Sequence, residues 1–319
     1  MKDHKMTLKL MALLADGGAH SGEYLGHSLG MSHSMIQQHI QTILKWGVDV
    51  FSITGKEYCL PNPIQLLEPN RILKFLEDKR LTVLSVVDST NQYLLDRIDR
   101  LQSGDACVAE YQYAGRGRRG RKWYSPFGAN LYLSIFWRLE YGIAATGLSL
   151  VIAIVMAEVL HHLGAEDVRV KWPNDLYLNN RKLAGILIEA TRRSGGVAHL
   201  VMGAGINLAM CGTNANFINQ EWINLKESGI RIDRNELVTS LINKLRQSLK
   251  QFENDGLTPF VARWRLLDNC IDRPVKLLMG EQQILGIYRG INQQGGLLLD
   301  QQGVIKLFNS GEISLRLAE

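Results

Sequence analysis

The sequence has no closely spaced cysteines and no long apolar run. Its four cysteines are scattered over 319 residues, without the paired spacing of a zinc site or of a disulfide framework. The longest apolar stretch, 148–159, is interrupted by Ser149 and Glu158 and is shorter than a membrane span. The first residues lack the apolar core of a secretory signal. We therefore expect a soluble, cytoplasmic protein with no membrane partner.

A large excess of one charge is also missing. The formal net charge is +5, from 36 Lys and Arg against 31 Asp and Glu, so the whole molecule is not a cationic coat for nucleic acid. Charged residues make up 21% of the sequence and there are 7 prolines, which argues against disorder. Hydrophobic residues make up 46%, which is enough to supply a sizeable core. A chain of this length holds about one to three domains.

The most concentrated feature is segment 115–123, called here the glycine–arginine loop. Gly115, Gly117 and Gly120 have the spacing of a dinucleotide-binding fingerprint, which is meaningful only between a strand and a helix. Here the loop is followed by Pro and Gly and then by a strand-like alternation over 130–137. That context excludes a Rossmann site. The glycines leave the backbone free to close on a ligand, and arginine forks match phosphate or carboxylate oxygens.

The alternative for this loop is a solvated basic segment or a nucleic-acid patch. The flanking segments 109–112 and 130–137 both have the pattern of sheet strands. A loop held between two strands suits the rim of an active site better than it suits a tail. We therefore predict that the glycine–arginine loop closes over a ligand.

The first part of the sequence predicts a winged helix-turn-helix domain over residues 1–62. An apolar segment indicates a first helix, and Ser21 and Ser32 are candidate N-caps of two more helices around a tight turn at Gly30. Residues 48–60 follow with the pattern of a hairpin. Helices joined by a tight turn and followed by a hairpin are typical of winged helix-turn-helix domains.

In this domain the third predicted helix would enter the major groove of DNA, where glutamine can form two hydrogen bonds with adenine. Residues 1–60 carry five Lys and five Asp or Glu, so the domain has no net charge. Because phosphate neutralisation supplies much of the affinity for DNA, one such domain should bind weakly, and a dimer with two half-sites would compensate. The alternative is a winged helix that serves only protein contacts. The predicted DNA-binding residues are Ser32, His33, Ser34, Gln37, Gln38 and Gln41.

A second domain is expected over residues 66–270, after a stiff proline-containing linker. Its first part predicts a helix at about 71–78, a strand over 82–87 and a helix over 92–100. Between the last two, residues 89–91 place two hydroxyls and an amide at the end of the strand. An ordinary N-cap cluster is the alternative to a ligand site there.

Further along, the apolar segment 148–160 predicts a core helix. Strands 168–178 and 182–189 are predicted around a turn at 179–181, where asparagine tolerates the left-handed conformation. Another apolar strand ends at 203–208, and its glycines allow close backbone approach to a bound group. The predicted hairpin carries two cations, an amide and a carboxylate, from Lys171, Asn174, Asp175 and Lys182.

These motifs closely resemble those of the biotin protein ligases. The resemblance is carried by residues 115–134, Lys171–Asp175 and Lys182–Leu187, and it runs essentially from end to end. With the predicted N-terminal domain, it extends to the bifunctional bacterial form that also represses the biotin operon. It implies a mixed α+β fold: a winged helix-turn-helix, a central mixed sheet with helices like that of class II aminoacyl-tRNA synthetases, and an SH3-like barrel over 271–319. Short glycine-punctuated strands from Arg273 onward agree with the barrel.

The resemblance implies an ATP-dependent ligase. The carboxylate of biotin attacks the α-phosphate of ATP, which gives biotinyl-adenylate and pyrophosphate. A lysine of the biotin carboxyl carrier protein of acetyl-CoA carboxylase then attacks the adenylate. Mg²⁺ accompanies ATP and is held largely by its phosphates. The resemblance also implies a homodimer that forms when the adenylate is bound and that represses the operator DNA of biotin biosynthesis genes.

The same resemblance gives individual residues their expected roles. Arg118 and Lys182 are the expected catalytic residues, because two anions must approach one another and cations are needed where negative charge accumulates. The expected biotin-binding residues are Ser89, Thr90, Asn91, Gln112, Arg116, Gly117, Arg118 and Lys182. The residues expected to bind ATP or the adenylate are Arg118, Arg121, Trp123, Asn174, Asp175, Asn207 and Trp222. No metal site made by protein ligands is predicted.

Two alternative functions remain at this stage. One is a biotin-sensing repressor without catalytic activity, and the other is a lipoate–protein ligase, which shares the central architecture. Lys182 and the intact glycine–arginine loop favour a ligase over a sensor, because a pure sensor has no need of adenylation cations. The biotin-type motif favours biotin over lipoate.

Overall fold

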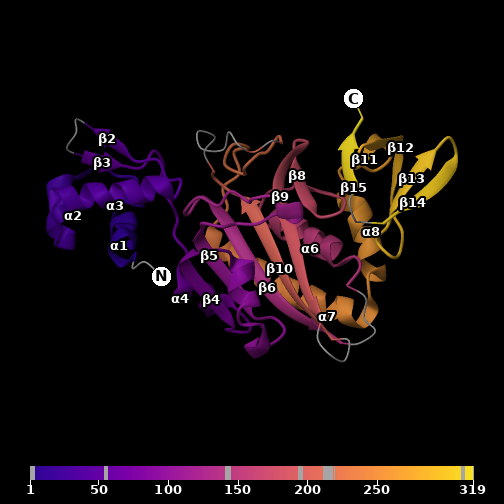
Figure 1. The fold of residues 1–319 in the computed structure, drawn as a ribbon, viewed down its shortest axis with the longest axis horizontal. Coiled ribbons are helices and arrows are strands. Elements are labelled where there is room, and N and C mark those ends of the chain that lie inside the picture. The colour runs from indigo at the N-terminus through magenta and orange to yellow at the C-terminus, as the bar shows by residue number, and fades with distance from the viewer. Residues whose placement is uncertain are drawn as a thin grey trace.

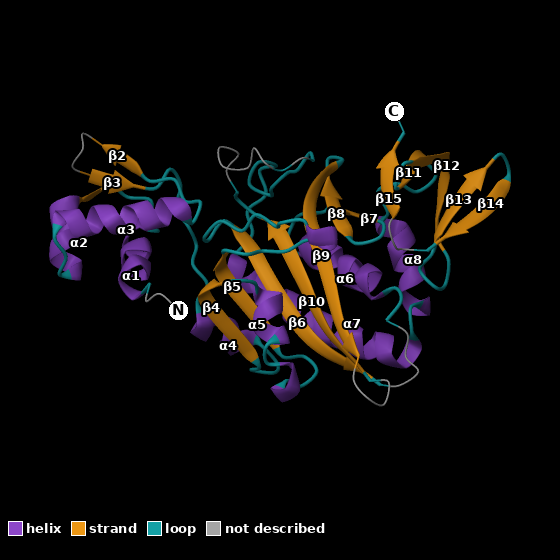
Figure 2. Ribbon diagram, viewed as in Figure 1, coloured by secondary structure: helices purple, strands orange, loops and turns teal. Residues whose placement is uncertain are grey.

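The computed structural model describes residues 4–53, 57–140, 145–192, 197–210, 218, 220–309 and 313–318. In this part of the chain the strands form a three-stranded, a seven-stranded and a five-stranded sheet. The three sheets follow one another from the indigo N-terminal unit, through the central unit, to the yellow C-terminal unit (Figure 1). Helices pack beside the central sheet (Figure 2).

The N-terminal unit combines helices with a small antiparallel sheet. Its elements are α1 (Lys5–Leu14), β1 (His20–Ser21), α2 (Gly22–Leu29), α3 (His33–Lys45), β2 (Phe51–Ile53) and β3 (Glu57–Cys59). The Ser21 side chain caps α2 and the Ser32 side chain caps α3, as predicted, by accepting hydrogen bonds from backbone N–H groups in their first turns. Gly30 ends α2 with φ 64°, a left-handed conformation that suits glycine.

The hairpin of this unit is shorter than expected. Its first strand begins at Phe51, because Val48 is still bonded to the end of α3 through its N–H and the Ile43 carbonyl. Residues 54–56, at the predicted hairpin turn, lie outside the described residues.

Aromatic side chains join the N-terminal unit to the central one. The Trp46 ring, just after α3, stacks on Phe127 with ring centroids 5.2 Å apart. The N–H of Phe127 donates to the Trp46 carbonyl at 2.9 Å, and Tyr111 lies beside the indole. The segment that follows the glycine–arginine loop is therefore fixed to the N-terminal unit.

The central sheet has the strand order β4-β5-β6-β10-β9-β8-β7. Its strands are β4 (Leu81–Val87), β5 (Ala106–Gln112), β6 (Asn130–Leu139), β7 (Arg169–Lys171), β8 (Asp175–Leu178), β9 (Arg181–Arg192) and β10 (Ala198–Asn207). β4 and β5 are parallel and the other neighbours are antiparallel, so the sheet is mixed, as expected.

Helices cover both faces of this sheet. They are α4 (Pro69–Phe75), α5 (Thr90–Leu95), α6 (Leu148–His162), α7 (Arg234–Asp255) and α8 (Thr258–Leu267), with a 3₁₀ turn at Ile98–Arg100. The predicted apolar helix is α6, which is buried along most of its length. Helices α7 and α8 were not predicted from the sequence.

Three predicted elements were wrong in their bounds. The first helix of the central unit begins at Pro69 and ends at Phe75, not 71–78, because proline is tolerated in a first turn and Leu76 is extended. The helix predicted over 92–100 is instead α5 followed by a separate 3₁₀ turn. The strand predicted over 168–178 is two antiparallel strands, because Pro173 lacks the N–H that a continuous strand needs.

The C-terminal unit has the strand order β14-β13-β12-β11-β15. Its strands are β11 (Pro274–Met279), β12 (Gln282–Ile291), β13 (Leu297–Gln301), β14 (Val304–Phe308) and β15 (Ile313–Leu317). The first four were predicted and β15 was not. The buried Asp268 carboxylate, after α8, accepts hydrogen bonds from Trp264 Nε1 and Tyr288 Oη, and so links the central unit to β12. Burial raises the pKa of Asp268 to about 6.

None of the helices in the described ranges is both long and apolar enough to cross a lipid bilayer.

Candidate active site

A cavity of about 160 Å³ lies over the central sheet beneath the glycine–arginine loop. The turn into α5, the loop itself, the β7–β8–β9 segment and β10 contribute residues to its lining. β15 adds a short stretch from the C-terminal unit, 313–316. The cavity therefore brings together the segments that the sequence motifs singled out, and adds one that they did not.

The lining of the cavity is strongly cationic. Among the described residues that form it, Asp175 is the single carboxylate, against eight Lys or Arg. A surplus of this size favours an anionic ligand, because the cations would otherwise repel one another in a partly desolvated space. The cations are Arg116, Arg118, Arg119, Arg121, Lys122, Lys171, Lys182 and Arg316.

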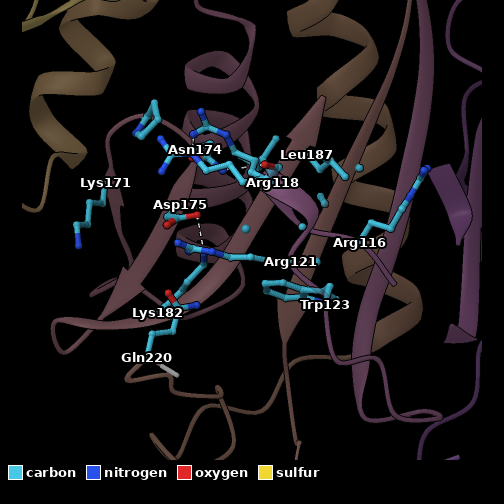
Figure 3. A pocket seen from close by; sticks show the side chains of 18 of the residues that line it. Arg116, Arg118, Arg121, Trp123, Lys171, Asn174, Asp175, Lys182, Leu187 and Gln220 are labelled. Atoms are coloured by element: carbon cyan, nitrogen blue, oxygen red, sulfur yellow. Dashed lines mark hydrogen bonds and ion pairs between the residues drawn. The ribbon is translucent and has the colours of Figure 1, made fainter. Parts of the chain in front are cut away.

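The two predicted catalytic cations are held by the β8–β9 hairpin. Lys182 Nζ lies 2.8 Å from the Asp175 carboxylate, and Arg118 donates to Asn174 Oδ1 at 2.7 Å. Burial and the neighbouring Arg119 lower the pKa of Arg118 below its usual value. Figure 3 shows Arg118, Asp175 and Lys182 gathered in the middle of the cavity. Their geometry is therefore fixed before an anion arrives.

The turn between β8 and β9 determines the register of this hairpin. Asn179 and Asn180 have φ of 52° and 57°, the left-handed conformation that the sequence predicted there. The register then places Asp175 opposite Gly185 of β9 and opposite Lys171 of β7.

A second region of the cavity is polar and uncharged. Thr90, Asn91 and Gln112 line it, Ser134 contacts two of them, and each of the four is at most 8% exposed. Thr90 donates through its N–H and its hydroxyl to Gln112 Oε1, at 2.8 and 3.1 Å. Ser134 Oγ lies 2.7 Å from Thr90 Oγ1 and 2.6 Å from Asn91 Oδ1. Side chains from β5, β6 and α5 thus form one buried network.

This network has acceptors to spare. Two hydroxyl protons, those of Thr90 and Ser134, serve three oxygen–oxygen contacts, so one contact has no proton between its oxygens. A ligand that donates N–H groups would relieve that mismatch. Ser89 is the N-cap residue of α5, as the N-cap alternative for residues 89–91 expected, but its side chain makes no capping bond, and Thr90 and Asn91 lie inside the helix.

Glycines on β9 and β10 make the floor of the cavity. Gly185 and Gly205 are register partners, and Trp123 lies against both, so that a Cβ on Gly205 would sit 2.5 Å from the indole. A Cβ on Gly203 would collide with the Asn91 amide. The close approach to the backbone that was predicted at the glycines of β10 is therefore made by the side chains of Trp123 and Asn91. Trp123 Nε1 is buried and has no hydrogen-bond partner among the described residues.

Two predicted site residues do not line the cavity. Asn207 is buried at the end of β10 and donates to the Ile223 carbonyl at 3.3 Å, which ties down the segment after it. Trp222 lies in that segment and forms a bridge with Lys182. Of the polar segment near Trp222, residues 211–217 and 219 lie outside the described residues.

Several residues around the cavity were missed or left without a role. Ser134, Glu189 and Arg316 had no signal in the sequence, because their position depends on strand register and on docking of the C-terminal unit. Gln220 also lines the cavity, from the polar segment that contains Trp222. Lys171 was noticed but given no role.

The six predicted DNA-binding residues lie on one short stretch at the start of α3 and are all exposed. Ser32 is the N-cap and the other five are within the helix. Among the described residues there is no group of three or more His, Cys, Asp or Glu placed to hold a metal ion.

Lys171 gives the stability of the fold a dependence on pH. Its side chain is 6% exposed, and Nζ donates to Tyr177 Oη at 2.9 Å. Burial lowers its pKa from 10.5 to about 8. Between these values the unfolded chain binds more protons than the folded one, so this group adds stability as pH rises from about 8 to about 10.5. Below about pH 8 Lys171 is protonated in both the folded and the unfolded state, so the cost of burying its charge lowers the stability of the fold by the full amount.

We therefore compare the free energy of unfolding of the Lys171→Met variant with that of the wild type at two pH values. The variant should be more stable relative to the wild type at about pH 7 than at about pH 10, by an amount on the order of 3 kcal/mol. Urea unfolding at both pH values measures that change. The variant Lys250→Met, which removes an exposed lysine, is the matched control. A pH-independent difference for Lys171→Met would contradict the burial argument.

Comparisons with known proteins agree with the arrangement of the cavity. Residues 83–207 match the model of the biotin/lipoate A/B protein ligase family, and residues 270–316 match that of the biotin protein ligase C-terminal domain. The bifunctional ligase/repressor BirA of Escherichia coli (strain K12) is 62% identical, over 100% of both chains. The biotin–[acetyl-CoA-carboxylase] ligase of Paracoccus denitrificans is 31% identical, over 68% of this chain and 92% of its own.

A similar structure has also been solved. It is the biotin protein ligase from Aquifex aeolicus in complex with biotin and ATP, with a TM-score of 0.65 and 32% identity. The match covers 76% of this chain and 100% of that one.

Proposed function

The chain belongs to the bifunctional ligase/repressor group of the biotin protein ligase family, and on that premise we propose that it attaches biotin to a protein lysine at the expense of ATP. The biotin carboxylate attacks the α-phosphate of ATP, and pyrophosphate leaves. The ε-amine of a lysine on the biotin carboxyl carrier protein of acetyl-CoA carboxylase then attacks the acyl carbon of biotinyl-adenylate, and AMP leaves.

The observation that carries this proposal is the pairing of two unlike regions in one cavity. Biotin has a ureido ring with two N–H donors at one end and a carboxylate at the other. The surplus acceptors of Thr90, Asn91, Gln112 and Ser134 suit the ring. The neighbouring cations suit the carboxylate and the phosphates. Lipoate has no N–H donors, so the same surplus favours biotin over lipoate.

We assign the catalytic roles to Arg118 and Lys182. Both are positioned by hairpin partners, Asn174 and Asp175, so that their charges face the place where the carboxylate and the α-phosphate meet. Fixed cations stabilise the charge that builds up there without reorganisation. Ser89, Arg116 and Gly117 complete the proposed biotin site.

The remaining assignments concern the nucleotide. Arg121 and Trp123 line the cavity, and the free Nε1 of Trp123 is available to the adenylate. Asn207 and Trp222 would act through the segment that they hold beside Lys182. Mg²⁺ bound to the ATP phosphates would neutralise part of their charge. Asp175 is already paired with Lys182, so the described lining offers no set of carboxylates for a metal by itself.

Mass spectrometry of an acceptor carrier domain tests this function. After incubation with the protein, biotin and ATP, we expect one biotin on the acceptor lysine. Omission of ATP, or an acceptor whose target lysine is replaced with arginine, should abolish the product. An unmodified acceptor in the complete mixture would refute the assignment.

A second function, repression, is proposed for the N-terminal unit. We propose that residues 1–62 form a winged helix-turn-helix domain, 66–270 the catalytic domain with a fold like class II aminoacyl-tRNA synthetases, and 271–319 an SH3-like domain. The exposure of the six α3 residues supports contact with operator DNA of biotin biosynthesis genes. α3 carries only Lys45 as a Lys or Arg, so two copies are needed for useful affinity.

The outer edge of β9 supports a homodimer. In the described ranges no strand pairs with that edge beyond Gly185, which leaves residues 188–192 without a strand partner on one side. Two such edges can pair about a twofold axis. We propose that the adenylate, by ordering the adjacent loop, favours this pairing and so acts as corepressor.

We therefore expect a larger dimer fraction, and tighter binding to promoter DNA of biotin genes, when biotin and ATP are both present. Sedimentation and a DNA-binding titration at fixed salt measure the two effects. The Gln37→Ala/Gln38→Ala variant should lose DNA binding and keep the dimer. Equal monomer fractions with and without the ligands would rule out the corepressor role.

A further inference from the structure

Glu189 is a half-buried carboxylate that none of the roles above uses. It lies on β9, away from the lining of the main cavity, and is 27% exposed. Its Oε2 accepts from Arg116 Nη2 at 2.8 Å and from Asn91 Nδ2 at 2.9 Å. One carboxylate oxygen thus joins the glycine–arginine loop to the uncharged region of the cavity. In Figure 3 Arg116 lies apart from Arg118, Arg121 and Lys182.

The other end of the loop is tied to the same region. Gln112 Nε2 donates to Ser125 Oγ at 2.9 Å, and Ser125 Oγ donates to the Trp123 carbonyl at 3.1 Å. The Trp123 N–H in turn donates to the Gly115 carbonyl at 2.9 Å, which closes the base of the loop. Both ends of the loop therefore reach one buried network.

That network is continuous from end to end. From Arg116 it passes through Glu189 and Asn91 to Ser134 and Thr90, and then through Gln112 and Ser125 to Trp123. Of the two attachments, the one at Trp123 uses neutral groups. The attachment at Arg116 uses an ion pair, which is the stronger kind of hydrogen bond and the one that depends on charge.

We propose that Glu189 is a positioning residue that latches the closed glycine–arginine loop to the biotin-head site, and so retains biotinyl-adenylate until the acceptor lysine arrives. This inference rests on the proposed function. Asn91 and Arg116 share one carboxylate, so displacement of either weakens the hold on the other. When the ureido ring of biotin occupies the uncharged region of the cavity, it fixes the Asn91 side chain. Asn91 then holds the Glu189 carboxylate in position to accept from Arg116. Occupation of the site by biotin and closure of the loop are thereby coupled.

This role also explains why the Arg116–Glu189 ion pair lies at the loop and not beside the reacting groups. The loop must open to admit biotin and must stay closed over an anhydride that water would hydrolyse. A partly exposed ion pair can break and re-form, whereas the buried neutral network cannot do so without leaving donors or acceptors unpaired.

The Glu189→Gln variant tests the latch, because it keeps an acceptor for Asn91 and removes the charge that Arg116 meets. We expect the dissociation rate of biotinyl-adenylate to rise about tenfold, and the KM for biotin to rise more than kcat falls. Stopped-flow displacement of the preformed adenylate measures the first effect, and steady-state pyrophosphate exchange gives the second. Released adenylate should also acylate lysines of a bystander protein such as serum albumin.

Glu227→Gln is the matched control, because Glu227 holds a similar ion pair with Arg181, 2.7 Å, outside the cavity. It should retain the adenylate as the wild type does. Arg116→Ala should reproduce the loss seen with Glu189→Gln, and the double variant should be no worse than either, since both remove the same ion pair and leave Asn91 its acceptor. Additive losses, or an unchanged dissociation rate in Glu189→Gln, would overturn the latch. If the wild type forms no adenylate, the proposed function fails instead.

Discussion

Replacing Lys182 with methionine is expected to lower the rate of biotin adenylation at saturating substrates by about 100- to 1,000-fold. Its ammonium group lies 2.8 Å from the Asp175 carboxylate and lines the cationic cavity in which we propose that biotin and ATP meet. Removing it takes away a preorganised charge at the place where negative charge accumulates, and leaves Asp175 to repel the incoming phosphate. Rapid-quench measurement of adenylate formation gives the rate of this step.

The control for this variant is Lys250→Met, which removes an exposed lysine on α7. It should adenylate biotin at the wild-type rate. Lys182→Arg should recover part of the rate, since it restores the charge with a different geometry. A Lys182→Met rate within about threefold of the wild type would show that the cation has no role in the chemical step.

Replacing Gly203 with alanine is expected to raise the KM for biotin by about 100-fold. The new Cβ would collide with the Asn91 amide, which is 3% exposed. Asn91 cannot yield, because Ser134 and Glu189 hold its two ends at 2.6 and 2.9 Å. Its displacement would leave buried partners unsatisfied and would distort the site proposed for the ureido ring. Titration calorimetry with biotin alone measures the loss without ATP.

Gly18→Ala provides the comparison for this substitution. Its added Cβ would come closest to the exposed side chain of Asp16, at 3.3 Å, in the N-terminal unit. Biotin affinity should remain at the wild-type value. If Gly203→Ala folds with an unchanged melting temperature and binds biotin as tightly as the wild type, the buried network is not the biotin site.

Local signals in the sequence predicted much of the fold. The N-caps at Ser21 and Ser32, the left-handed turn at Gly30 and the asparagine turn of the β8–β9 hairpin each depend on a few neighbouring residues, and all are present. The strand predicted over 168–178 failed because an alternating pattern continues across Pro173, while the backbone does not. The bounds of such elements depend on which N–H groups find partners, which the pattern alone does not reveal.

The candidate site was predictable where its residues share a motif and not where they meet across the sheet. Arg118 and Lys182 come from compact motifs and lie in one cavity. Ser134 and Glu189 occupy ordinary positions in strands, and only the register of β6, β10 and β9 brings them to Asn91. Arg316 reaches the cavity because β15 docks there, and no local pattern announces a contact between units.

The glycine–arginine loop shows how far context decides the meaning of a pattern. Its glycine spacing fits a dinucleotide fingerprint, yet the next regular elements are a 3₁₀ turn at Arg118–Gly120 and then strand β6. Between the 3₁₀ turn and β6, where every residue is described, no α-helix begins whose N-terminus could receive a pyrophosphate. The loop instead places arginines over a cavity and is tied at both ends to one network, within the described residues.

Biotin-dependent exchange of label between pyrophosphate and ATP tests the central claim most directly, because it reports adenylate formation without an acceptor protein. The assay compares biotin with lipoate at equal concentrations. We predict rapid exchange with biotin and little or none with lipoate, and loss of the biotin signal in Lys182→Met. No exchange with biotin, or equal exchange with lipoate, would contradict the assignment of this cavity as the site where biotin is adenylated.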